Sequence, residues 1–210
     1  MFNKLYSLYK NYRKRLCQKL KYGREKRRLK NNEFSIISNA CFGGFIYHNL
    51  QKEFLSPTIN LWIGADYDDF MKFLLNMDHY LNCELKFFKG PNEKKYPRAY
   101  LDDILIGFNH YETEDEAKSA WERRKKRILK DRIYVIYWNP RGIKKEQYDK
   151  LTAMNFRNVA VISYEDTVKD FSTCRIKRQD SSFEWFSKDR NGIRLYEKYF
   201  DYVEFLNTNS

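Results

Sequence analysis

Apolar and polar positions follow two different patterns along this chain, and the pattern changes near residue 33. In the N-terminal segment, apolar side chains recur every three or four positions, the period of one face of an α-helix. They are Leu5, Tyr9, Tyr12, Leu16 and Leu20. From residue 34 onward, short apolar runs alternate with longer amphipathic stretches. The pattern predicts an N-terminal helix followed by a body in which strands and helices alternate.

The short apolar runs of the body predict β-strands, and the amphipathic stretches predict helices. The strands are expected over 34–38, 59–63, 84–88, 101–110, 133–138 and 159–163. The helices are expected over 45–50, 68–81, 113–129, 144–154 and 195–206. Thr113 and Glu116 form a capping-box pattern at one helix start. This alternation predicts an α/β fold with a mainly parallel sheet and helices on both faces, a Rossmann-like three-layer arrangement.

Length and composition limit the number of domains and the class of protein that the chain can form. It has 210 residues, of which 42% are hydrophobic and 18% aromatic, so it can form one sizeable core. The expected domains are a basic arm over 1–32 and a single α/β domain over 33–210. No run of about 18 apolar residues and no apolar secretory segment is present, so a cytoplasmic protein is expected. The cysteines at 17, 41, 83 and 174 show no paired spacing, so neither a zinc site nor a disulfide framework is predicted.

The net charge of +12 is concentrated in the arm. Residues 1–32 contain twelve basic residues and one acidic residue, whereas residues 33–210 contain 28 basic and 27 acidic residues. A helix with Leu and Tyr on one face and cations around it suits an anionic membrane surface. The alternative is a helix that packs on its own domain. Specific nucleic-acid binding is not expected, because no helix-turn-helix, RNP-like or zinc-finger pattern accompanies the charge.

Polar residues follow several of the predicted strands. If those strands are parallel, the residues share the sheet edge at which such folds bind ligands. They are Ser38, Asn39, Cys41, Gly43 and Gly44 after the first strand, Asp66 after the second, His110 at the end of the fourth, Asn139 and Arg141 after the fifth, and Tyr164 and Glu165 after the last.

The turn that contains Cys41 carries the candidate chemistry. A cysteine at a helix start has its thiolate favoured by the helix dipole, and a nearby histidine completes a nucleophile–base pair for covalent acyl transfer. The expected base is His110 or His48, which lies seven residues after Cys41. The alternative is a small buried thiol beside two packing glycines. His79 is expected at the surface, Cys83 and Cys174 as structural thiols, and no metal site is predicted.

The other residues of this edge are expected to bind substrate. Asn39 and the backbone of Gly43 and Gly44 would hold an oxyanion or a phosphate. Ser38, Asp66 and Arg141 complete the predicted substrate-binding set.

Several short motifs along residues 33–207 resemble, in the same order, the motifs of one protein family. They are the turn Ser38-Asn39-x-Cys41-x-Gly43-Gly44, then Ser56-Pro57-Thr58, Asp69-Phe70, Tyr96-Pro97, Asp103-Ile104, His110-Tyr111, Glu116-Ala117, Trp121, Arg124, Arg127, and Tyr196 with Tyr199-Phe200-Asp201-Tyr202-Val203. They are similar to a bacterial family of unknown biochemical function whose members are usually labelled exopolysaccharide or capsular polysaccharide biosynthesis proteins. In that family the turn after the 133–138 strand usually carries an acidic residue and Arg-Gly-Cys. Here residues 139–143 lack the acid and that cysteine.

The resemblance implies a role in the assembly of surface polysaccharide. The leading hypothesis is a transferase that moves an acyl (acetyl) group, with acetyl-CoA as the guessed donor, to a hydroxyl of a sugar or lipid-linked sugar. The arm would hold it as a peripheral protein at the inner membrane face. The alternatives are a glycosyl or sugar-phosphate transferase that uses a nucleotide sugar, and a non-catalytic assembly or regulatory protein of the polysaccharide machinery.

Overall fold

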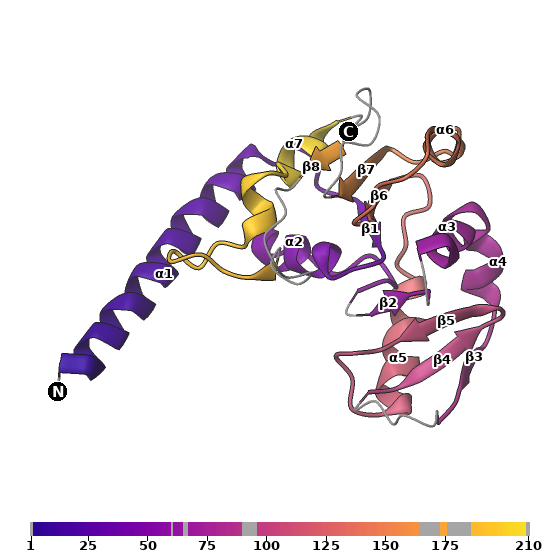
Figure 1. Cartoon of the computed structure of the whole chain (residues 1–210), viewed down its shortest axis with the longest axis horizontal. Helices are drawn as coiled ribbons and strands as arrows, with labels where there is room; N and C mark the ends of the chain where they lie inside the picture. Colours follow the sequence, from indigo (N-terminus) through magenta and orange to yellow (C-terminus); the bar gives the residue numbers. More distant parts are fainter. Residues whose placement is uncertain are drawn as a thin grey trace.

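The computed structural model describes residues 2–59, 61–64, 67–89, 96–163, 173–175 and 186–208. Its strands form two separate four-stranded sheets (Figure 1). The helices are α1 (Phe2–Arg28), α2 (Phe42–Leu50), α3 (Tyr67–Leu75), α4 (Met77–Asn82), α5 (Glu114–Lys125), α6 (Lys145–Thr152) and α7 (Tyr202–Asn207), with the 3₁₀ helix η2 (Leu195–Lys198). The strands are β1 (Ser35–Ser38), β2 (Trp62–Ile63), β3 (Leu85–Phe87), β4 (Arg98–Leu101), β5 (Ile104–Gly107), β6 (Ile133–Trp138), β7 (Asn158–Ser163) and β8 (Thr173–Arg175).

The first sheet is parallel throughout, in the order β1-β6-β7-β8. Its central strand β6 is apolar along its whole length, as a parallel strand covered on both faces requires. Successive side chains point to opposite faces. Val135 and Tyr137 belong to the core shared with α3, α6 and the second sheet. Tyr134 and Ile136 belong to the core shared with α2 and α7. The α/β prediction is therefore confirmed, with one of the sheets parallel.

The expectation of one mainly parallel sheet is wrong, because the chain forms a second sheet. It is antiparallel, in the order β2-β5-β4-β3, and it is inserted between β1 and β6. The predicted strand over 101–110 is instead a hairpin that turns at Asp102 and Asp103. Asp102 has φ 57°, a left-handed conformation that Asp tolerates in tight turns. The apolar alternation on both sides of this polar pair concealed the turn.

Several predicted helices have different bounds from those expected. The segment 68–81 is divided at Asn76 into α3 and α4. Helix α2 begins at Phe42 rather than residue 45, which places Gly43 and Gly44 in its first turn. The capping box of Thr113 and Glu116 at the start of α5 is confirmed. The final predicted helix is divided into η2 and α7.

The C-terminal half of α1 packs on the end of the chain through polar contacts. The Arg13 and Gln18 side chains donate to the carbonyls of Arg190 and Gly192, each at 2.7 Å. Further along, Lys21 donates to Glu197 at 2.9 Å and also contacts Glu25. Glu25 accepts in turn from the buried Tyr202 hydroxyl. The helix continues through Gly23 because these contacts fix it on both sides of that residue.

The apolar stripe of α1 faces largely away from Lys21 and Glu25. At about 100° per residue, Tyr9 lies about 120° and 160° around the helix from Lys21 and Glu25, and Leu20 lies about 100° and 140° from them. Both are exposed, at 61% and 65%. In Figure 1 the N-terminal half of α1 projects beyond the sheets and the other helices. None of the described helices is long and apolar enough to cross a membrane.

Candidate functional site

Cys41 occupies the start of helix α2, directly after the carboxyl end of β1. It is the N-cap residue, and its carbonyl accepts from the Phe45 N–H at 3.1 Å. No side chain caps this end among the described residues. The N–H groups of residues 42–44 therefore have no partner within the helix and form its positive end. The half-buried thiol sits where this positive end favours an anion.

His110 comes to Cys41 from the other sheet. It follows β5, in the turn before α5, and its Nε2 lies 3.7 Å from the Cys41 Sγ. That distance is within hydrogen-bonding range for sulfur. His110 is exposed and Cys41 is half-buried, so the pair stands at the surface, where a substrate can reach it. The arrangement supplies a nucleophile with a general base in contact.

Arg124 on α5 fixes the turn that carries His110. Its guanidinium donates to the Ile59 carbonyl at 2.9 Å and to the Tyr111 hydroxyl at 2.5 Å. It also lies over the Phe54 ring, 5.2 Å from the ring centre. Arg124 is nearly buried, so these contacts join α5, the segment beside β1 and the residue next to His110. Arg124 is a positioning residue for the pair.

Arg194 modifies the electrostatics of the thiol. Burial raises the pKa of Cys41, and the charge of Arg194 lowers it in part. The guanidinium lies over the Phe45 ring, 3.6 Å from its centre, and its Nε has no partner among the described residues. Sequence reasoning missed this residue, because it stands in a segment without a motif, far from Cys41 along the chain. No local signal could have found it.

Asn39 and Ser38 shape the turn that presents Cys41. The Asn39 side chain donates to the Trp138 carbonyl and accepts from the Trp138 N–H, both at 2.8 Å, which ties the end of β1 to β6. The buried Ser38 hydroxyl accepts from the Ala40 N–H at 3.3 Å. In the described contacts both side chains form hydrogen bonds with backbone groups, so they stabilise the conformation of the turn.

Gly43 packs toward the core. A Cβ at this position would stand 3.3 Å from side-chain atoms of Ile36 and Ile59, closer than ordinary contact. Gly44 is also buried. The two glycines let α2 approach β1 closely, and this approach sets the position of Cys41.

Of the remaining predicted residues, His48 lies away from the Cys41–His110 pair, and some others lie outside the described residues. His48 is exposed in the last turn of α2, about 10 Å along the helix from Cys41. Asp66 lies outside the described residues, as do Tyr164 and Glu165. Within the described structure, Cys41 is in contact with His110 and not with His48.

Arg141 lines a separate depression at the carboxyl end of β6. This depression has a volume of about 460 Å³. Its lining residues are Asp68, Asn139, Arg141, Gly142, Ile143, Lys144 and Gln147. The buried Asn139 accepts from the Arg141 N–H at 3.0 Å, which fixes the turn at its rim. The depression is at the sheet edge where parallel α/β folds bind ligands.

Residues 11–207 match the model of one protein family, described as a domain of unknown function, DUF1919. The chain belongs to this family. It is also similar to an uncharacterized protein of Haemophilus influenzae strain Rd, at 31% identity over 185 residues. That similarity covers 86% of this chain and 87% of the relative.

The DUF1919 match begins inside the basic arm, at residue 11. The resemblance of residues 33–207 left the arm out, so the family domain reaches further toward the N-terminus than expected. The arm residues that contact the C-terminal segment, from Arg13 to Arg28, all lie within the match. The matched residues thus include this part of α1 together with η2 and α7.

Proposed function

We propose that this DUF1919 protein is an acyltransferase that acts through Cys41. The observation that carries the proposal is the 3.7 Å contact between Cys41 Sγ and His110 Nε2 at an uncapped helix start. His110 would take the thiol proton, and the thiolate would attack the carbonyl carbon of an acyl thioester such as acetyl-CoA. The new S–C bond forms as the donor's C–S bond breaks. The departing thiolate takes the proton from the imidazolium.

A hydroxyl group would then accept the acyl group. His110, neutral again, removes the hydroxyl proton as the oxygen attacks the acyl carbon. The Cys41 thiolate leaves and takes this proton back from the His110 imidazolium, which restores the starting thiol and base. Each step passes through a tetrahedral oxyanion. The N–H groups of residues 42–44, which have no partner within α2, are the donors nearest to the thiol along the chain, and they suit this charge.

The acceptor we propose is a sugar hydroxyl in the assembly of exopolysaccharide or capsule. The support for this substrate class is the family resemblance over residues 33–207, whose turn at Cys41 and residue His110 are both present in the site. A nucleotide-sugar transferase is the second candidate. The position of Gly43 favours it less, because this glycine faces Ile36 and Ile59 rather than open space for a diphosphate. A non-catalytic assembly protein is the third.

The proposal places the protein in the cytoplasm, peripherally at the inner membrane face. It is supported by the exposed stripe of α1 and by the cations that surround it. The proposal also includes a Rossmann-like three-layer arrangement, supported by helices α2 and α7 on one face of the parallel sheet and α3 and α6 on the other.

Intact-protein mass after incubation with acetyl-CoA tests the mechanism. The expected result is one acetyl adduct on the unaltered protein and none on Cys41→Ala. The uncatalysed reaction of a thiol with a thioester is slow, so only Cys41 is expected to be acetylated. Cys17→Ala and Cys83→Ala therefore serve as matched controls and should still form the adduct. An adduct that persists in Cys41→Ala would exclude the covalent mechanism. Nucleotide-sugar binding that is equal in the unaltered protein and Cys41→Ala, with no adduct in either, would favour the second candidate.

Vesicle sedimentation tests the membrane contact of α1. The protein is expected to sediment with anionic phospholipid vesicles and not with neutral phosphatidylcholine vesicles. Changing the exposed Tyr9, Tyr12 and Leu16 together to Ser should weaken anionic binding by at least about tenfold, because these side chains would enter the interface. Leu75→Ser with Tyr199→Ser removes exposed apolar side chains elsewhere and should leave binding unchanged. Equal binding of both variants would show that the stripe is not the contact.

A further inference from the structure

Three potential metal ligands meet at the edge of the antiparallel sheet, away from the Cys41 site. His79 is on α4, Cys83 directly follows that helix, and Asp102 is in the turn between β4 and β5. The His79 Nε2 lies 2.8 Å from Asp102 Oδ2 and 3.6 Å from Cys83 Sγ. The possible ligand atoms of the three residues all lie within 4.8 Å of one another.

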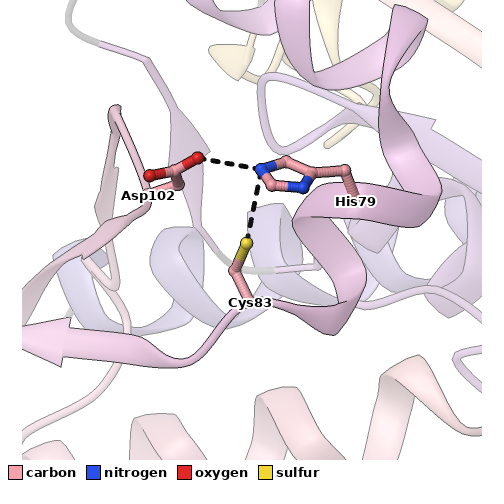
Figure 2. Close-up of side chains that lie close together, drawn as sticks. All are labelled: His79, Cys83 and Asp102. Atoms are coloured by element: carbon pink, nitrogen blue, oxygen red, sulfur yellow. Dashed lines mark hydrogen bonds and ion pairs between the residues drawn. The ribbon is translucent and has the colours of Figure 1, made fainter.

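The geometry of this cluster differs from that of a catalytic triad. In a triad, the nucleophile and the carboxylate bond to different nitrogens of the histidine. Here both partners approach the same atom, His79 Nε2, while the other ring nitrogen points away from them (Figure 2). Three possible ligand atoms within 4.8 Å of one another are close enough to bind one cation.

Local structure holds the three side chains on one side of a shared space. His79 and Cys83 are four residues apart, so one helical turn places them on the same face. The hairpin turn is fixed against α4 and α3 by its second aspartate, because Asp103 accepts from the Tyr80 hydroxyl at 2.8 Å and from Lys72 at 3.3 Å. Asp102 is thereby presented toward α4.

We propose that His79, Cys83 and Asp102 form a binding site for a zinc-like divalent metal ion. Thiolate, imidazole and carboxylate together are a ligand set of Zn²⁺, whereas Mg²⁺ and Ca²⁺ prefer oxygen ligands alone. Tetrahedral coordination at ordinary bond lengths sets N···S at about 3.6 Å and N···O at about 3.3 Å. The observed 3.6 Å matches the first, and the pair at 2.8 Å needs to open by roughly half an ångström to meet the second.

Binding would change the protonation of the cluster and leave one position open. The thiol proton of Cys83 passes to solvent as the sulfur–metal bond forms, and Nε2 binds through its lone pair, so the ring proton stays on Nδ1. The side chains of His79 and Asp102 are each 57% exposed, which leaves room for water as a fourth ligand. The ion would join α4 to the β4–β5 hairpin. This proposal is independent of the acyl-transfer proposal, since the two sites share no residue.

Titration with Co²⁺ tests the site without an activity measurement. The full chain, purified with chelator and reductant, is expected to bind one Co²⁺ with a thiolate-to-cobalt charge-transfer absorption. Cys83→Ser should lose this absorption. Cys41→Ser and Cys17→Ser should retain it, which separates this cluster from the Cys41–His110 pair. No such absorption in the unaltered protein, or the same absorption in Cys83→Ser, would overturn the proposal.

Titration with Zn²⁺ in a calorimeter tests the carboxylate with a matched pair of variants. Loss of even an outer-shell partner weakens metal binding about 10- to 100-fold, so Asp102→Asn should weaken it by at least about 100-fold. Asn tolerates the left-handed backbone of this position, so the turn is retained. Glu84→Gln makes the same change in charge at an exposed carboxylate beside Cys83 and should change binding by less than about threefold. Equal affinities of the two variants would contradict the assignment of Asp102.

Discussion

Replacing His110 by Gln is expected to slow the acylation of Cys41 by a factor of about 10² to 10⁴. The imidazole is the group in contact with the thiol, at 3.7 Å, and a positioned general base contributes rate in this range. Burial raises the pKa of Cys41, so at neutral pH the thiol retains its proton and needs a base to remove it. The rate of acetyl adduct formation under single-turnover conditions, followed by mass spectrometry, measures the effect.

His48→Gln is the matched control for this prediction. The same residue type is changed, but His48 is exposed at the far end of α2, so the acylation rate should be unaffected. Raising the pH should recover much of the rate in His110→Gln, because hydroxide then ionises the thiol without the imidazole. If His48→Gln slowed the reaction as much as His110→Gln, the assignment of the base would be wrong.

Replacing Lys21 by Met is expected to lower the free energy of unfolding by about 3–5 kcal/mol. The ammonium group bridges Glu25 and Glu197, whose side chains are only 10% and 0% exposed. Removing it leaves two buried carboxylates without their shared cation. Buried charges without a partner strongly destabilise the folded state. Burial, together with the Glu25 carboxylate, raises the pKa of the Tyr202 hydroxyl, so that residue stays neutral and donates to Glu25. Urea unfolding followed by circular dichroism measures the loss.

Two further variants separate the ion pair from a general effect on α1. Lys19→Met removes a lysine from the exposed side of the same helix and should change stability by less than about 0.5 kcal/mol. Lys21→Met combined with Glu25→Gln removes one of the stranded carboxylates and should recover part of the loss. If Lys21→Met and Lys19→Met were equally stable, Lys21 would not fix α1 to the C-terminal segment.

His110 or His48 was predicted as the base for Cys41, and His110 was included on an incorrect assumption. Both residues were expected at one edge of a single parallel sheet. In the structure His110 follows β5, which belongs to the antiparallel sheet. The two residues meet because the inserted unit packs against the parallel sheet, and Arg124 links the His110 turn to the segment beside β1. Contacts of this kind depend on side chains far apart in the chain, and no local pattern encodes them.

Other parts of the site depend on tertiary structure in the same way. The Asn39 side chain was predicted to hold an oxyanion, and its described bonds are to the backbone of Trp138 on the neighbouring strand. His79 and Cys83 were expected to be a surface residue and a structural thiol. Their spacing on α4 was visible in the sequence, but the third member, Asp102, comes from a hairpin turn that the apolar pattern concealed.

Local periodicity encodes several elements of this protein. The amphipathic period of α1, the apolar runs of β1, β6 and β7, the capping box of α5 and the position of Cys41 at a helix start each follow from residues close together in the chain. Tertiary structure alone decided the division into two sheets, the partners of Cys41, and the face on which α1 packs. The reason is physical: a strand's apolar pattern fixes which side chains are buried, whereas its neighbours and their direction are fixed by packing between distant segments.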